Sequence, residues 1–217
     1  MNTIRKILFL TACLWGINAQ ALDARGQENL EEIQAEWAEI KYRAQEKERE
    51  KAFERLDATA RQALAASPDA PELLIWRGIV LASWAGAKGG LGALDLVKEA
   101  RRSLETALEK DPSALDGSAY TSLGSLYYQV PGWPIGFGSG ARAEEMLQKA
   151  LAINPDGIDP NFFHGDYLLR EGRYDEARAA LLKARAAAPR PGREVADEGR
   201  RREIDALLAK IDEKTRK

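Results

Sequence analysis

The sequence predicts an all-α protein, a right-handed α-solenoid of about four helix pairs with a C-terminal capping helix, in which two units have long loops between their helices. Three observations support this prediction. Pro112, Pro155 and Pro189 each follow alanine, leucine and alanine at the same three distances. A glycine stands upstream of each of these segments. A single helix pair of this kind would leave its row of apolar side chains in water, so several pairs must stack on one another to bury these side chains.

The register before each proline is the same in three consecutive units. Alanine, leucine and alanine lie five, eight and twelve residues before it: Ala107, Leu104 and Ala100, then Ala150, Leu147 and Ala143, then Ala184, Leu181 and Ala177. These spacings place one apolar stripe along each predicted second helix. The prolines end these helices because a proline cannot donate to the hydrogen-bond ladder and disfavours helix in the residue before it.

The units differ in the distance between their two helices. From Gly78, Gly124 and Gly165 to the following stripe alanine the separation is 22, 19 and 12 residues. The last separation is the shortest, so the first two units contain about 10 and 7 extra residues. These extra residues include Trp84, 88–90 and 133–140. We expect the two insertions to lie at one edge of the solenoid, because they join equivalent helices in neighbouring units.

The elements follow in order along the chain. A degenerate first unit has Trp37 and Ile40 in its first helix and Leu56 in its second. The first helix of the next unit is expected from Leu73 to about Trp84, with an insertion over 85–92. The predicted units are 29–68, 71–112, 116–155 and 158–189, followed by a capping helix over 194–213 whose charged face, 200–203, should point to water.

The third unit has the residues Tyr120, Leu123, Gly124, Tyr127, Ala143, Leu147, Ala150 and Pro155 at the spacing of a known repeat. The chain therefore resembles the tetratricopeptide repeat family. The resemblance implies a non-enzymatic scaffold that binds a protein or peptide in its concave groove. The groove side chains would come from the first helices, and the candidates are Trp76, Tyr120, Tyr127, Asn161 and Tyr167.

An alternative function follows from a second resemblance. The long insertions and the stretch 126–131 are similar to the periplasmic T-component proteins of TRAP transporters, which are tetratricopeptide lipoproteins that partner a solute-binding protein. This resemblance implies a ligand-binding or transporter-accessory role. Independently of this resemblance, the aromatic side chains of the insertions, Trp84, Trp133 and Phe137, are costly to leave in water. They either pack against the edge of the solenoid or line a pocket for a small molecule or peptide, together with Tyr120, Tyr127 and Tyr128.

Residues 1–21 have the features of a signal peptide. Arg5 and Lys6 precede an apolar run, and 19–21 read Ala-Gln-Ala, a small-x-small cleavage site. Cleavage after Ala21 predicts a single exported domain over 22–217, in the periplasm. Leu10 to Cys13 also resemble a lipobox, so a lipid anchor at Cys13 is the alternative. The apolar run is too short for a membrane-spanning helix.

Composition excludes several classes of function. The chain has 32 basic and 34 acidic residues, and removal of the leader gives a formal charge of about −4, which argues against nucleic-acid binding. Cys13 is the only cysteine and His164 the only histidine. A zinc site would therefore need an all-carboxylate remainder. The glycines over 136–140 lack the lysine of a phosphate-binding loop. We predict no catalytic residue, no metal and no cofactor.

Overall fold

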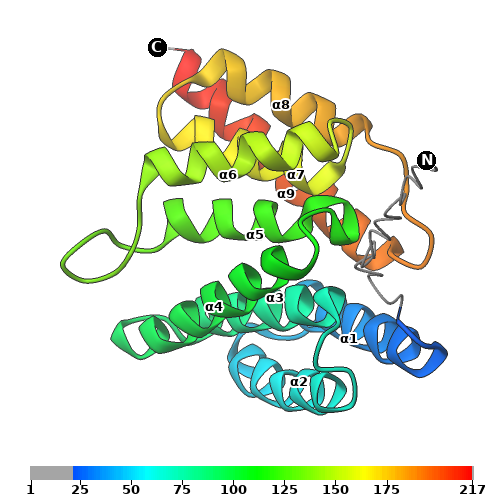
Figure 1. Ribbon diagram of the computed structural model, residues 1–217. Helices are drawn as coiled ribbons and strands as arrows, with labels where there is room; N and C mark the ends of the chain where they lie inside the picture. The colour runs from blue at the N-terminus through cyan, green and yellow to red at the C-terminus, as the bar shows by residue number, and fades with distance from the viewer. Residues whose placement is uncertain (1–21, 217) are drawn as a thin grey trace, which may run out of the picture.

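The computed structural model describes residues 22–216, and it consists of four helix hairpins followed by one long helix (Figure 1). No β-strand occurs between residues 22 and 216. The predicted all-α class and the helical repeat are therefore confirmed. The predictions for the signal peptide and for Cys13 concern residues outside the described range.

The hairpins follow one another without long connections. Their helices are α1 (Ala24–Tyr42) and α2 (Glu46–Ala66), α3 (Pro71–Lys88) and α4 (Leu94–Lys110), α5 (Ala114–Gln129) and α6 (Gly140–Ile153), α7 (Ile158–Arg170) and α8 (Tyr174–Ala186), with α9 (Glu194–Thr215) at the end. The first helices α1, α3, α5 and α7 contact one another in sequence, and each second helix packs on the next first helix. The first helices thus form one continuous layer.

The same contact closes three hairpins. A Cβ atom placed on Gly78, Gly124 or Gly165 would lie 2.6 to 2.7 Å from the Cγ atom of the stripe leucine opposite, Leu104, Leu147 or Leu181. Each of these leucines is completely buried. Only a glycine lets the two helices approach this closely, so the repeated glycine and leucine positions have one physical cause in all three units.

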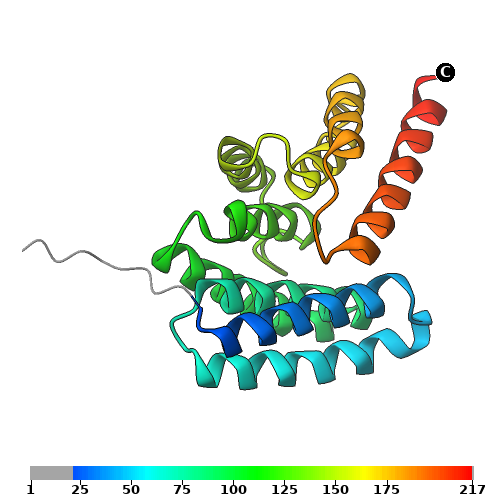
Figure 2. The same ribbon diagram turned by 90° about the vertical axis from the view of Figure 1, so that its right-hand side faces the viewer.

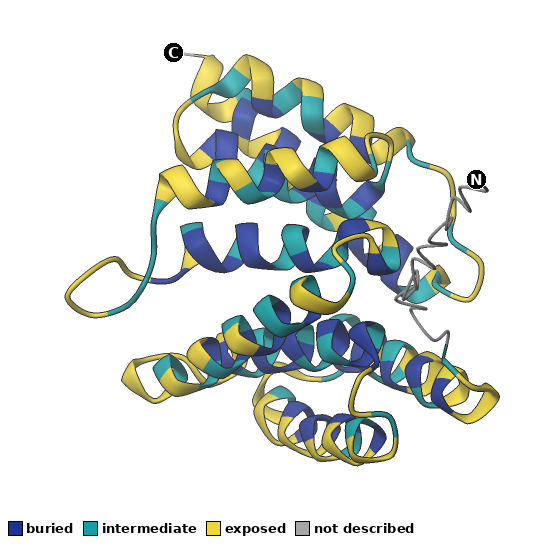
Figure 3. Cartoon of the chain, in the orientation of Figure 1, coloured by how far each residue is buried: buried dark blue, intermediate teal, exposed yellow. Residues whose placement is uncertain are grey.

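Figure 3 shows where the buried residues lie along the helices. They form two clusters that share α3. The larger cluster runs from α3 to the C-terminal half of α9, where Ile204, Leu208 and Ile211 pack. The smaller one joins α1 and α2 to α3 and includes Ala196, near the start of α9. The two halves of α9 are therefore packed against opposite ends of the solenoid.

The first insertion is shorter as a loop than the sequence predicts. Helix α3 continues through Ala85 to Lys88, because Ala85 is buried and the intervening residues tolerate a helix. The chain turns at Gly89 and Gly90, whose φ angles of 65° and 60° suit glycine, and a short 3₁₀ turn over Leu91–Ala93 leads into α4. Part of the insertion therefore lengthens the helix.

The second insertion forms a compact loop over residues 130–139. The amide of Gly138 donates to the carbonyl of Pro131 over 3.0 Å, and the amide of Ser139 donates to the carbonyl of Tyr127 over 2.8 Å. A Cβ atom on Gly138 would overlap the backbone at Val130. Both inserted turns lie on the left edge of the solenoid in Figure 1.

Among residues 22–216, no helix combines the length and the apolar content that a membrane crossing requires.

Candidate binding groove

The described residues form a groove of about 680 Å³. Its walls come from the first helices α1, α3, α5 and α7, from the N-terminal half of α2, and from residues 190–203, which lead into α9 and form its first turns. Helix α5 contributes a row of hydroxyl side chains to it, Ser118, Thr121, Ser122 and Ser125. Because these residues are three and four positions apart, they lie on one face of the helix. The apolar positions of α5, including Leu123 and Leu126, are buried in the core.

Helix α9 does more than cover the end of the last repeat. It starts beside α1 and then rises along α7 and α8 (Figure 2). At this crossing Gly199 lies directly against Tyr42, and a Cβ atom there would overlap the tyrosine ring. The hydroxyl of Tyr42 donates to Glu203 Oε2 over 3.2 Å, and Lys41 Nζ lies 3.6 Å from Glu203 Oε1. The last helix therefore contacts the first one and closes one side of the groove.

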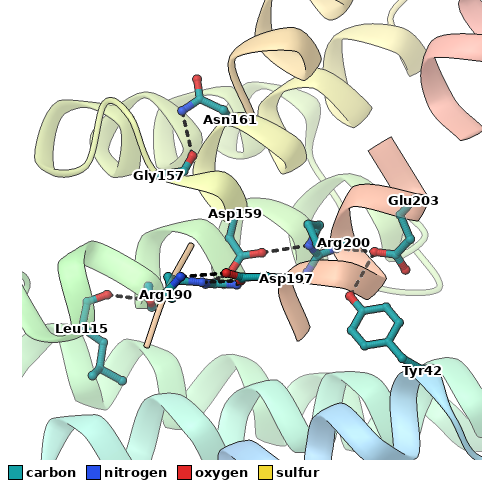
Figure 4. A network of polar contacts seen from close by, with 10 residues as sticks. Tyr42, Leu115, Gly157, Asp159, Asn161, Arg190, Asp197, Arg200 and Glu203 are labelled. Atoms are coloured by element: carbon teal, nitrogen blue, oxygen red, sulfur yellow. Dashed lines mark hydrogen bonds and ion pairs between the residues drawn. The ribbon is translucent and has the colours of Figure 1, made fainter. Parts of the chain in front are cut away.

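A network of charged side chains holds α9 in this position (Figure 4). The guanidinium of Arg200 donates to Asp159 Oδ1 over 2.8 Å and to Glu203 Oε2 over 2.7 Å. Arg190 donates to the other oxygen of Asp159 over 2.6 Å and to Asp197 Oδ1 over 2.8 Å. Asp159 thus joins the start of α7 to both arginines.

The position of Arg200 corrects one prediction. The sequence predicts that the charged face of the capping helix, 200–203, points to water, whereas Arg200 is only 7% exposed. Its guanidinium also stacks on Phe162 and Phe163, at 4.2 and 4.8 Å from the ring centroids. Paired carboxylates and aromatic faces together offset the cost of burying this charge. Helical periodicity alone does not show that α9 folds back.

The network shifts the pKa values of its members. Burial alone would raise the pKa of Asp159, but the nearby Arg200 and Arg190 hold it well below its usual range. Burial raises the pKa of Tyr42 well above its ordinary value, against the opposing charge of Arg200 and with a contribution from Glu203. Near neutral pH the carboxylate of Asp159 is therefore charged and the phenol of Tyr42 is neutral.

An aromatic corner lies where α1, α3 and α9 meet. Trp37 and Trp76 pack edge to face, with 5.7 Å between ring centroids, and both line the groove. The indole N–H of Trp37 donates to Ser83 Oγ over 2.8 Å. The guanidinium of Arg193 lies 4.8 Å from the centroid of Trp76. Both tryptophans thus have structural contacts as well as faces on the groove.

Trp76 is the one predicted site residue among the groove-lining side chains. Asn161 is buried, and its amide donates to the carbonyls of Pro155 and Gly157, each over 2.8 Å, so it holds the turn before α7. Tyr128 donates to Asp166 Oδ2 over 2.8 Å and lies 5.8 Å from Tyr167 between ring centroids. The binding roles assigned to these residues stay predictions.

The aromatic residues of the insertions have different surroundings. Phe137 packs edge to face on Tyr127 at 5.7 Å, and the guanidinium of Arg101 lies over both rings. Trp84 is partly buried in the core, whereas Trp133 is 90% exposed at the tip of its loop. Trp133 therefore neither packs on the solenoid nor lines the groove.

The remaining candidates lie outside the groove. Tyr120 lies beneath the ammonium of Lys149, 5.7 Å from its ring centroid. Burial and the nearby Arg173 lower the pKa of His164, whose ring lies 3.4 Å from the amide nitrogen of Gln148. Within residues 22–216, no group of three histidine, cysteine, aspartate or glutamate side chains could hold a metal ion.

A comparison with known protein families shows which repeat the helix hairpins match. A sequence model of the tetratricopeptide repeat matches residues 135–211, from the second insertion into α9. This part of the chain contains tetratricopeptide repeats. Proteins built from them generally serve as non-enzymatic scaffolds for interactions with other proteins, so the repeats suggest protein partners for this chain.

Two further comparisons describe the chain's relation to other proteins. The crystal structure of a thermophilic TPR protein from Thermus thermophilus is similar over 86% of this chain and 98% of its own length, with 18% sequence identity and a TM-score of 0.45. No curated protein matches the sequence.

Proposed function

We propose that this chain is an exported, non-enzymatic tetratricopeptide scaffold that binds a segment of another protein in the groove between its first helices and α9. The observation that carries the proposal is the groove itself, which combines aromatic faces with a row of hydroxyl groups on α5. Aromatic side chains supply contact area, and hydroxyl oxygens can accept hydrogen bonds from a peptide backbone, including those of Ser118 and Ser125, which donate to the carbonyls of Leu115 and Ser122. An extended segment would use both kinds of contact.

Blocking the groove tests this proposal. Ser122→Trp places a bulky ring on the groove face of α5, and Ala179→Trp places the same ring on an exposed position of α8. We expect the wild type and Ala179→Trp to retain the same partner from the exported fraction, and Ser122→Trp to lose it. Circular dichroism establishes that all three are folded, and calorimetry with the purified partner measures the affinity. A folded Ser122→Trp variant that binds as tightly as the wild type would refute the proposal.

The size of the groove supports a second candidate, a ligand-binding role as an accessory to a transporter. Its volume of about 680 Å³ falls in the range of roughly 300 to 1,000 Å³ that small-molecule sites occupy. In this case the purified protein would bind a small solute saturably without any partner protein. A thermal-shift screen of solutes, repeated with Ser122→Trp, separates this candidate from the first.

Export is part of the proposal and rests on the leader-like residues 1–21. An N-terminus at Leu22 in protein isolated from the periplasm supports cleavage after Ala21. Incorporation of a labelled fatty acid at Cys13 would instead support a membrane-anchored lipoprotein. Retention of residues 1–21 in a cytoplasmic protein would contradict both.

A further inference from the structure

Arg193 differs from the other cationic side chains of the groove. Arg190 and Arg200 each contact two carboxylates, and Lys41 lies 3.6 Å from Glu203. Arg49 donates to the carbonyl of Ala44 over 3.2 Å. The side chain of Arg193 has neither an ion pair nor a hydrogen bond to any described residue, although its Nε atom is buried. Trp76 supports one face of its guanidinium at 4.8 Å.

The surroundings of Arg193 favour the addition of a negative charge. Burial and the neighbouring Arg190 lower the pKa of Arg193 to about 10, in spite of the charges of Asp159 and Asp197. Both of these carboxylates already accept hydrogen bonds from Arg190. Arg193 as a whole is partly exposed, but its Nε atom is buried without a hydrogen-bond partner, which is unfavourable, and an added carboxylate would supply that partner.

The position of Arg193 indicates where on a segment this carboxylate would be. Trp76, on which Arg193 stacks, belongs to α3, which lies between α1 and α5 in the layer of first helices. The groove continues on both sides, towards Gln34 on α1 and towards Ser122 on α5. A segment that fills the groove must therefore extend on both sides of Arg193. The end of a chain would leave one side empty.

We propose that the groove selects an extended segment with an internal aspartate or glutamate, whose carboxylate pairs with Arg193 beside Trp76. This inference rests on the proposed function and adds the chemistry of the partner. The cation comes from the N-terminus of α9 and is brought to the groove by the return of that helix to α1. The hydroxyl row of α5 would contact the backbone of the same segment.

A display library of random heptapeptides tests this inference, with each heptapeptide flanked on both sides so that no chain terminus is available. The baits are the full chain, Arg193→Gln and Arg193→Glu. Arg202→Gln is the matched control, because it removes the same charge from an exposed position of the same helix, where Arg202 pairs with Glu198. Circular dichroism and melting curves establish that each bait is folded.

We expect the wild type and Arg202→Gln to enrich segments with an acidic residue at one position. Arg193→Gln should bind these segments at least about tenfold more weakly, as expected for the loss of a charge-assisted hydrogen bond. Arg193→Glu should instead select lysine or arginine at that position. If the wild type selects segments without an acidic preference, or if Arg193→Gln keeps that preference, the inference is wrong.

A Ser122→Trp bait separates this inference from the proposed function. If the wild type enriches no segment beyond those retained by Ser122→Trp, the groove does not bind peptides and both proposals fail. Segments that depend on an open groove but not on Arg193 would refute only the acidic preference.

Discussion

The close approach of α5 and α6 at Gly124 predicts that the same added methyl group has opposite effects at two glycines of this chain. Gly124 faces Leu147 across the hairpin, whereas at Gly86, near the end of α3, a Cβ would meet no atom within 4 Å apart from its chain neighbours and the backbone of its own helix. Both glycines lie in helices. Gly124→Ala and Gly86→Ala therefore compare one chemical change in a filled and in an open environment.

The magnitude follows from two terms. Replacement of glycine by alanine in a helix stabilises it by up to about 1 kcal/mol, and this gain applies at both positions. At Gly124 the new Cβ would lie 2.7 Å from Leu147 Cγ and 2.8 Å from Cδ2. Because Leu147 is completely buried, its displacement should cost about 1 to 3 kcal/mol. Gly124→Ala should therefore be less stable than Gly86→Ala by about 1 to 3 kcal/mol.

Urea unfolding followed by far-ultraviolet circular dichroism measures both free energies. We expect Gly86→Ala to be stabilised by up to about 1 kcal/mol and Gly124→Ala to be destabilised by up to about 2 kcal/mol. For a domain of this size, each kcal/mol corresponds to roughly 2 to 4 °C in Tm. Equal shifts in the same direction would show that the glycine contact does not limit the approach of the helices. Gly165→Ala, at the equivalent position of the next hairpin, should repeat the result.

Three further outcomes follow from the groove and the loop. Asp159→Asn leaves Arg200 without one of its carboxylates, so it should lower the free energy of unfolding by about 2 to 4 kcal/mol in a urea titration. The control Asp205→Asn removes a carboxylate from an exposed ion pair and should change this free energy by at most about 1 kcal/mol. Tyr42 has a raised pKa in the folded protein, so its contribution to stability is complete below about pH 10 and is lost as the pH rises above that value. Tyr42→Phe should therefore reduce the difference between the Tm at pH 9 and the Tm at pH 11. An unchanged difference would contradict this assignment. Trp133→Ala should leave the Tm within about 1 °C, since the side chain is 90% exposed, and should weaken partner capture if the loop edge contributes to binding; full capture by the folded variant would show that it does not.

The sequence predicts the repeated hairpins well because their contacts are local and periodic. Gly78, Gly124 and Gly165 each lie opposite a leucine at the same position of the second helix. In each hairpin the glycine packs directly against this leucine side chain. The hydroxyl spacing on α5 is also visible in the sequence, but that spacing alone does not indicate a groove. For Trp133, an aromatic residue in a loop indicated packing or a pocket, and the compact glycine turn instead holds it in water.

By itself, the sequence determined the all-α class, the register of the repeats and the presence of two insertions, because in a stacked helical array each unit is specified mainly by its own stripe and its nearest neighbour. Only the tertiary structure decided the path of α9, since that path depends on contacts between distant parts of the chain. Asp159 and Arg200 are 41 residues apart, and Tyr42 and Glu203 are 161 residues apart. These contacts bury Arg200, and the same return of α9 closes the groove and places Arg193 beside Trp76, which no helical periodicity in the sequence encodes.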